Sequence, residues 1–268
     1  MLQLLKTLFT DREMKFRPAV PAGQRIYAIG DIHGRLDLFE SLADAIERDD
    51  REAGPAETTV ILLGDLVDRG PASAGVLRFA RGWQSRRRVR ILCGNHEEMF
   101  LRSFDDSDMM RHFMRHGGRQ TVLSYGIDPK ALGTASVAEM QAMMRDCVPK
   151  QDRDYIAAFE DMIPIGDFVF VHAGINPEAV LAEQRPQDLR WIREPFLSHS
   201  EPHEKVVVHG HTIFDEVQDR GNRIGIDTGA YSTGRLTALV IEGSERRFIQ
   251  AVERDDGTIA VKPMAPAR

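Results

Sequence analysis

Short apolar runs alternate with longer amphipathic stretches along most of the chain. The runs rich in Val, Ile, Leu and Phe predict strands at 25–29, 58–63, 89–93, 168–171, 205–208, 223–226, 236–241 and 247–252. Helical spacing of Leu36, Phe39, Leu42 and Ile46 predicts a helix after the first strand, and 75–83 also has a helical pattern. This alternation favours an α/β fold, in which the last two strands are expected to complete a second sheet.

Residues 98–162 differ from the rest of the chain. They are rich in Met and charge, have helical periodicity, and are interrupted by Gly117-Gly118, Gly126 and Gly133. We therefore expect a helical insertion within a single domain that covers residues 1–268. The first 16 residues, with leucines at helical spacing, predict a short amphipathic helix that packs on the domain, with a membrane-surface anchor as the alternative.

Polar side chains follow five of the predicted strands at the point where each strand ends. In open α/β sheets, ligands bind at the carboxyl ends of the strands, so these side chains are expected to converge. The converging residues are Asp31, His33, Asp65, Asn95, His172 and His211. Spacing alone does not separate His211 from His209, because the two histidines share strand parity.

This mixture of carboxylate, imidazole and amide ligands, without a thiolate, suits Mn, Fe or Zn. About six ligands that include one shared carboxylate indicate two metal ions, which in such sites lie about 3.5–4 Å apart. A water that bridges the two ions loses its proton readily and can act as a nucleophile. The strand ends therefore predict a dinuclear metal site.

Composition narrows the function classes. The formal net charge is −6, so stable nucleic-acid binding is not expected, and Arg86-Arg87-Arg88 is interpreted as a solvated helix end. Two cysteines cannot form a disulfide framework in 268 residues, which favours a reducing compartment, the cytoplasm. No apolar run reaches the length of about 18 residues that a membrane span needs.

Five motifs carry a resemblance to a known family. They are GDIHGR at 30–35, GDLVDRG at 64–70, GNHE at 94–97, HAG at 172–174 and GHT at 210–212. In this order they resemble the calcineurin-like metallophosphoesterase superfamily. GDLVDRG with GNHE resembles its phosphoprotein phosphatase branch, with bacterial serine/threonine phosphatases and symmetrical diadenosine tetraphosphatases as the nearest members. The resemblance implies two mixed β-sheets packed as a sandwich and flanked by helices.

The resemblance also implies metal roles. Asp31 and His33 would hold the first metal, and Asp65 would bridge both. The second metal would be completed by Asn95, His172 and His211, with Asn95 also facing the substrate. The family pattern places the ligand directly after the glycine, so His209 becomes a neighbour or a structural residue.

Further roles follow from the same resemblance. His96 would be the general acid that protonates the leaving group, and Asp68 would fix its tautomer and raise its pKa. Arg69 and Arg193 would bind phosphoryl oxygens. Arg190, close to Arg193, is interpreted as part of a surface ion pair.

The function predicted from the resemblance is hydrolysis of phosphomonoesters by direct attack of a metal-bridging hydroxide. Two divalent ions are expected as cofactors, with manganese favoured over iron and zinc. The expected partner is the substrate itself, a phosphorylated protein or a phosphorylated small molecule. Phosphoserine or phosphothreonine of proteins is the favoured substrate. The alternative is hydrolysis of dinucleoside polyphosphates or nucleotide-capped ends. A non-catalytic binding module is disfavoured, because every expected metal ligand and both His96 and Asp68 are present.

Overall fold

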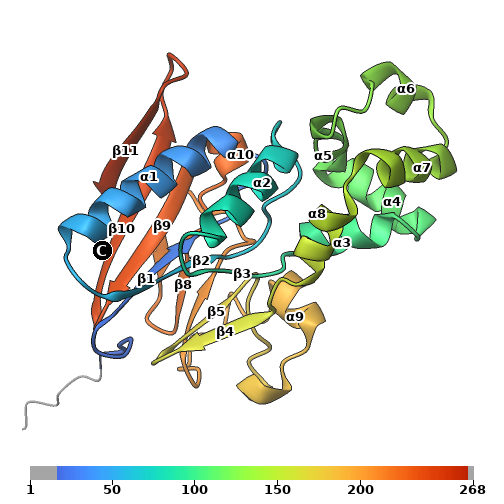
Figure 1. Cartoon of the computed structure of the whole chain (residues 1–268). Coiled ribbons are helices and arrows are strands. Elements are labelled where there is room, and N and C mark those ends of the chain that lie inside the picture. The colour runs from blue at the N-terminus through green and yellow to red at the C-terminus, as the bar shows by residue number, and fades with distance from the viewer. Residues whose placement is uncertain (1–16, 265–268) are drawn as a thin grey trace, which may run out of the picture.

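The computed structural model describes residues 17–264, so the predicted N-terminal amphipathic helix lies outside the described residues. Two mixed β-sheets are packed against each other, with helices on the outside (Figure 1). This arrangement confirms the predicted α/β sandwich. None of the helices within residues 17–264 has the length and apolar character needed to cross a membrane.

The first sheet has six strands in the order β11-β10-β9-β1-β2-β3. Its strands are β1 (Gln24–Ile29), β2 (Glu57–Leu62), β3 (Val89–Ile91), β9 (Arg235–Glu242), β10 (Glu245–Glu253) and β11 (Ile259–Met264). β1, β2 and β3 are parallel, whereas β9 runs antiparallel to β1. The carboxyl ends of the parallel strands therefore lie at one edge of the sheet.

The second sheet has five strands in the order β4-β5-β6-β8-β7. Its strands are β4 (Met162–Ile165), β5 (Phe168–Val171), β6 (Val206–His209), β7 (Gln218–Asp219) and β8 (Arg223–Gly225). β5, β6 and β8 are parallel to one another. β5 and β6 end next to His172 and His211, so these histidines are held by a different sheet from Asp31 and Asp65.

One prediction about the sheets is wrong. The strands expected at 236–241 and 247–252 are β9 and β10, and they belong to the first sheet rather than the second. β9 is buried on both faces, with Ala238 and Val240 toward the helices and Leu239 and Ile241 toward the second sheet, so it fits a central position beside β1. β4, β7 and β11 were not predicted; β4 begins at the end of the segment assigned to the insertion.

Helices cover both outer faces. α1 (Leu36–Glu52) and α2 (Ser73–Gln84) lie on the first sheet, and α9 (Pro186–Trp191) packs on the second (Figure 1). The predicted insertion is helical and separates β3 from β4. It consists of α3 (Asn95–Ser103), α4 (Ser107–Phe113), a kinked turn (Met114–Gly118), α5 (Arg119–Ser124), α6 (Pro129–Thr134), α7 (Val137–Cys147) and α8 (Lys150–Ala157). A one-turn helix, α10 (Ala230–Thr233), precedes β9.

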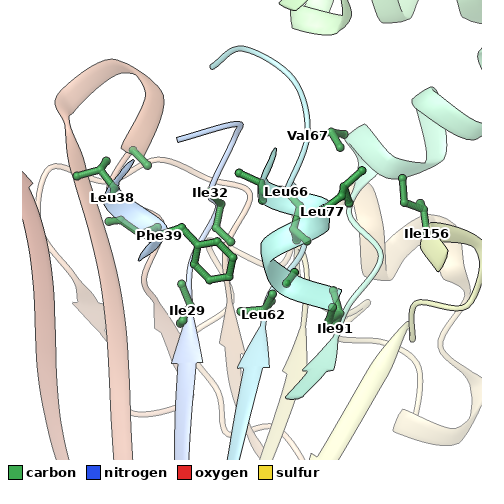
Figure 2. Packing of buried hydrophobic residues seen from close by; sticks show 14 of the residues in the cluster. Ile29, Ile32, Leu38, Phe39, Leu62, Leu66, Val67, Leu77, Ile91 and Ile156 are labelled. Atoms are coloured by element: carbon green, nitrogen blue, oxygen red, sulfur yellow. The ribbon is translucent and has the colours of Figure 1, made fainter. Parts of the chain in front are cut away.

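Alternation along each strand divides the core. Successive residues of a strand point to opposite faces of the sheet. On the face toward the helices, Ile29 of β1 and Leu62 of β2 pack with Leu38, Phe39 and Leu77 (Figure 2). The opposite faces of the two sheets pack on each other through a second cluster that contains Ile26, Ile61, Phe168, Phe170 and Ile224. The strand ends are thus anchored on both sides by fully buried side chains.

Phe170 tests the core between the sheets, because its side chain is fully buried on β5 two residues before His172. We expect Phe170→Ala to lower the free energy of unfolding by about 3–5 kcal/mol, through lost burial and the cavity left behind. Urea unfolding measures this change. Val180→Ala, at a side chain that is 56% exposed, should change stability by less than about 0.5 kcal/mol. Equal losses in the two variants would contradict this packing.

Candidate metal centre

Unusual backbone conformations mark the site. Among residues 17–264, the non-glycine residues with positive φ are His33, Asp65, Asp68, Arg69 and His211, with φ between 45° and 73°. All five were predicted from the sequence to be site residues. The left-handed conformation is unfavourable for residues with a side chain and persists only where surrounding contacts enforce it. The loops at the strand ends are therefore held in place by tertiary contacts.

The loops after β1 and β2 are bonded directly to each other. The N–H of His33 donates to the carbonyl of Asp65 at 2.8 Å, and the N–H of Gly34 donates to the carbonyl of Leu66 at 2.9 Å. In the other direction, the N–H of Gly70 donates to the carbonyl of His33 at 3.0 Å. These bonds place His33 and Asp65 side by side.

A buried carboxylate fixes the loop after β2 from the other side. Glu97 accepts hydrogen bonds from the N–H groups of Gly94 at 2.9 Å, Asp65 at 2.8 Å and Leu66 at 2.8 Å, and from that of Val67 at 3.3 Å. The sequence alone indicates no role for Glu97 beyond its place in GNHE. Its side chain connects the turn that carries Asp65 to the start of α3, where Asn95 and His96 lie.

Asp65 stands at the centre of the candidate ligands. Within residues 17–264, two groups of three side chains have ligand atoms within 4.8 Å of one another, and Asp65 belongs to both. One group is His33, Asp65 and His96; the other is Asp65, His172 and His211. All of these side chains are buried. This geometry supports the bridging position that the sequence predicted for Asp65.

Two of the histidines have a defined tautomer. The Nδ1 atoms of His33 and His172 lie 2.8 Å from the carbonyls of Val67 and Leu63. A carbonyl can only accept, so Nδ1 carries the proton and Nε2 keeps its lone pair. Each Nε2 atom lies 3.4 Å from an oxygen of Asp65. This is the orientation in which a metal-binding histidine is held by a second contact.

Asn95 and His211 extend the second group. The Oδ1 atom of Asn95 is 3.1 Å from Nε2 of His172 and 2.9 Å from Nδ1 of His211. Nε2 of His172 carries no proton, so it cannot donate to Oδ1 of Asn95, and both atoms offer a lone pair to the space between them. Nε2 of His211 is buried without a hydrogen-bond partner in the described chain, and burial lowers the pKa of His211 to about 2, so the ring stays neutral. This donor set fits a divalent cation.

Asp31 lies beside these groups and belongs to neither. Its carboxylate accepts the N–H of His211, with the closer oxygen at 3.0 Å. Burial, followed by the charges of Asp227 and Asp65, raises the pKa of Asp31. Asp227 received no role from the sequence, yet it is buried next to Asp31 and accepts the N–H of Gly229 at 2.9 Å. The pair adds carboxylate oxygens beside the backbone of His211 and the carboxylate of Asp65.

The structure separates the two histidines that spacing left open. His211 belongs to a candidate metal group, and His209 does not. The Nδ1 atom of His209 donates to the carbonyl of Gly210 at 3.0 Å, and its ring packs edge-on to Phe196 at a centroid distance of 5.1 Å. His209 therefore packs within the second sheet.

The predicted acid pair is formed beside Asp65. Nδ1 of His96 lies 2.6 Å from a carboxylate oxygen of Asp68, and its Nε2 lies 3.2 Å from Nη2 of Arg69. Burial alone lowers the pKa of His96, but the charges of Asp65 and Asp68 outweigh it and the pKa is raised. The guanidinium of Arg69 stacks on the ring of Tyr231 at 4.5 Å, a contact that the sequence did not predict.

Arg190, near the end of α9, and Arg193, two residues after α9, differ in their contacts. Arg190 is engaged by Asp161 at 2.7 Å and Glu98 at 3.3 Å, in agreement with its interpretation as an ion-pair residue. Arg193 is exposed and has no ion pair among residues 17–264. After burial and the influence of His172, its charge also contributes to the lowered pKa of His211. Arg193 is therefore the arginine with free hydrogen-bond donors near the site.

Comparison with known proteins gives the family. The profile of the calcineurin-like phosphoesterases matches residues 24–233, most of the chain. The chain belongs to the calcineurin-like phosphoesterase family. This phosphoesterase is 26% identical over 235 residues to the asymmetrical bis(5'-nucleosyl)-tetraphosphatase PrpE of Bacillus subtilis, covering 79% of this chain and 88% of PrpE.

Two further comparisons add a relative of known name and a solved structure with the same fold. Serine/threonine-protein phosphatase 2 of Escherichia coli is 25% identical over 225 residues, covering 82% of this phosphoesterase and 94% of that protein. A crystal structure provisionally assigned as a diadenosine tetraphosphatase shares the fold, with a TM-score of 0.58, 20% identity, and coverage of 94% of this chain and all (100%) of the other. The family makes the chain a metal-dependent phosphoesterase, while the named relatives differ in substrate.

Sequence reasoning missed four residues around the metal centre of this phosphoesterase: Glu97, Thr121, Asp227 and Tyr231. Thr121 lies in the insertion and donates to Asp68 at 2.6 Å. Asp227 and Tyr231 belong to DTGAYSTGRL, whose position at a strand end was the signal available for them. Glu97 belongs to GNHE, which was the signal available for it, whereas Thr121 has no local pattern that would distinguish it from an ordinary helical residue.

Asp65 is the first residue to test. We expect Asp65→Asn to weaken Mn²⁺ binding by at least about 10- to 100-fold, since one shared charge is lost and even outer contacts have effects of that size. Metal analysis after dialysis measures the bound ions. Asp108→Asn, at a side chain that is 95% exposed, is the control and should keep the wild-type content. Unchanged metal content in Asp65→Asn would rule out the bridging position.

Proposed function

We propose that this chain hydrolyses phosphate esters with two divalent metal ions held by the strand-end ligands. Asp31, His33 and Asp65 would hold one ion, and Asp65, Asn95, His172 and His211 would hold the other. When bound, such ions stabilise negative charge on phosphoryl oxygens and activate water. The observation that carries the proposal is the buried His96–Asp68 pair, directly beside the carboxylate shared by both candidate metal groups.

His96 is the general acid in this proposal. The 2.6 Å contact with Asp68 fixes the proton on Nδ1 in the neutral ring, so the second proton that makes His96 an acid is carried on Nε2. Nε2 lies 3.9 Å from Asp65 and so faces the proposed metal centre. From this position it transfers its proton to the leaving oxygen as the bond to phosphorus breaks.

Arg69 and Arg193 complement the phosphate. Arg69 contacts Nε2 of His96 and stacks on Tyr231, which holds its planar group at the edge of the site. A bound phosphate offers oxygens that a guanidinium binds bidentately, so Arg69 exchanges its contact with His96 for the substrate. This exchange leaves Nε2 of His96 free to face the leaving group. Arg193, exposed and unpaired among the described residues, supplies a second cation.

Phosphoserine and phosphothreonine of proteins are the favoured substrates. Their alkoxide leaving groups are poor and need a proton from a general acid, which matches the buried acid pair. An anhydride releases a phosphate oxygen, for which protonation matters less. The relative in Escherichia coli that is named a serine/threonine-protein phosphatase supports this choice.

Dinucleoside polyphosphates are a second candidate, favoured by three rings beside the site. The rings of His112 and His116 lie at a centroid distance of 4.0 Å with their planes tilted by 37°, and the ring of His112 lies 6.5 Å from that of Trp191. The next residue, Gly117, accepts the N–H of Arg69 at 3.1 Å, so the rings adjoin the phosphate-binding arginine. Partly exposed rings can stack on a nucleobase. The Bacillus subtilis relative named a bis(5'-nucleosyl)-tetraphosphatase agrees with this candidate.

The general-acid role is tested with two aryl esters. We expect His96→Ala to lower kcat for phenyl phosphate about 10²–10⁴-fold, because a general acid contributes that much when the leaving group is basic. The loss for p-nitrophenyl phosphate should be much smaller, because nitrophenolate leaves without a proton. His33→Ala is the control and should lower both rates through metal loss. Equal losses on both esters in His96→Ala would contradict the role.

The substrate class is tested by direct competition. We expect the chain with Mn²⁺ to hydrolyse a phosphothreonine peptide with a higher kcat/KM than diadenosine tetraphosphate. Trp191→Ala should then leave the peptide KM within about twofold, because the peptide needs no stacking platform. A preference for the dinucleotide, with a KM that rises about tenfold or more in Trp191→Ala, would favour the second candidate, since stacking contributes about 1–3 kcal/mol per base. Turnover of no phosphate ester would reject the proposed function itself.

A further inference from the structure

The helical insertion reaches the acid pair at one point. Thr121 on α5 is fully buried, and its hydroxyl donates to Oδ1 of Asp68 at 2.6 Å. The other carboxylate oxygen, Oδ2, is the one that contacts His96. Thr121 and His96 therefore hold the two oxygens of the same carboxylate from opposite sides.

The hydrogen bonds of the Thr121 hydroxyl are all used. Its oxygen accepts the N–H of Asp68 at 2.8 Å and lies 2.9 Å from the hydroxyl of Ser73. A hydroxyl has one proton, which Thr121 gives to Asp68, so the bond between the two hydroxyls is donated by Ser73. The N–H of Asp68 also reaches Ser73 at 3.0 Å. The three residues of this network, Ser73, Thr121 and Asp68, are all fully buried.

The insertion also supports the backbone of the same turn. The carbonyl of Gly117 accepts the N–H of Arg69, and a side chain at Gly117 would collide with that backbone. On the far side, the hydroxyl of Ser124 accepts the N–H of Ala74 at 3.0 Å. α5 packs against α2 in this region (Figure 1). Two contacts thus join the insertion to the left-handed turn and a third joins it to α2, and only that of Thr121 involves the carboxylate of Asp68.

We propose that Thr121 is a positioning residue, which sets the orientation of Asp68 and through it that of His96. The proposal rests on the proposed general-acid role of His96. Asp68 is fully buried, so without Thr121 one of its oxygens has no hydrogen-bond donor in its place and the carboxylate can rotate away from His96. The helical insertion is then a structural part of proton transfer to the leaving group, beyond its place at the edge of the site.

Thr121→Val tests this proposal, because valine keeps the shape of threonine and removes the hydroxyl. We expect kcat for phenyl phosphate, whose leaving group has a pKa of about 10 like that of tyrosine, to fall about 10- to 100-fold. For p-nitrophenyl phosphate we expect a loss of less than about threefold, because its departure does not wait for a proton. Thr121→Ser keeps the hydroxyl and should restore most of the phenyl phosphate rate. Metal content should equal that of the wild type.

Ser124→Ala is the matched control. It removes a contact between the same helix, α5, and the first turn of α2 without touching Asp68, so any loss should be equal for the two esters. Equal losses on both esters in Thr121→Val, or no rescue by Thr121→Ser, would overturn the positioning role and leave a structural one. If Thr121→Val does not fold, Ser73→Ala is measured in the same way, with a selective loss expected and a uniform loss or no loss overturning the proposal. Wild-type chain that hydrolyses neither ester would instead reject the proposed function.

Discussion

The contact of Glu97 with four backbone N–H groups is the constraint on which the site depends. Asp65, Asp68 and Arg69 adopt left-handed backbone conformations that a free chain would leave, and the carboxylate of Glu97 holds the N–H groups at the start of this turn. The same carboxylate holds Gly94, directly before Asn95 and His96. The ends of two neighbouring strands, β2 and β3, are thereby joined by one side chain, which holds Asp65 and His96 at a fixed separation.

The two sheets supply different candidate ligands to the site. The first sheet and its loops present Asp31, His33, Asp65 and Asn95, and the second presents His172 and His211. Burial of the facing strands through Ile61, Phe168 and Phe170 fixes the distance between the two sets. The charge of the site can be tolerated in a buried position because carboxylates are surrounded by imidazoles, backbone N–H groups and Arg69, in keeping with the rule that buried polar groups are paired.

Much of this arrangement could be predicted from the sequence, because each ligand follows an apolar run that ends abruptly in Asp, Asn or His. That signal is local, and it pointed to Asp65 and to the pair His209 and His211, between which only the family resemblance chose His211. It could not assign β9 and β10 to their sheet, because a strand buried on both faces has the same pattern in either sheet. Nor could it find Thr121, which lies 53 positions from Asp68 in the sequence and is chemically like any helical threonine. Substrate specificity depends on such distant contacts and on the residues at the edge of the site. The local sequence pattern therefore predicts it least well.

The central place of β9 has a consequence for the order in which the protein is made. β1 pairs with β9 from Arg25 to Ile29, and the N–H of Gly30, next to Asp31, bonds to the carbonyl of Thr237. During synthesis, therefore, β1 is made long before β9 and one of its edges stays unpaired until then. The pairing of Arg25 with Glu242 spans 217 positions of the sequence. Open edges recruit other chains, and distant pairings form slowly. The nascent chain thus exposes an open edge at the strand that directly precedes its first proposed metal ligand, Asp31.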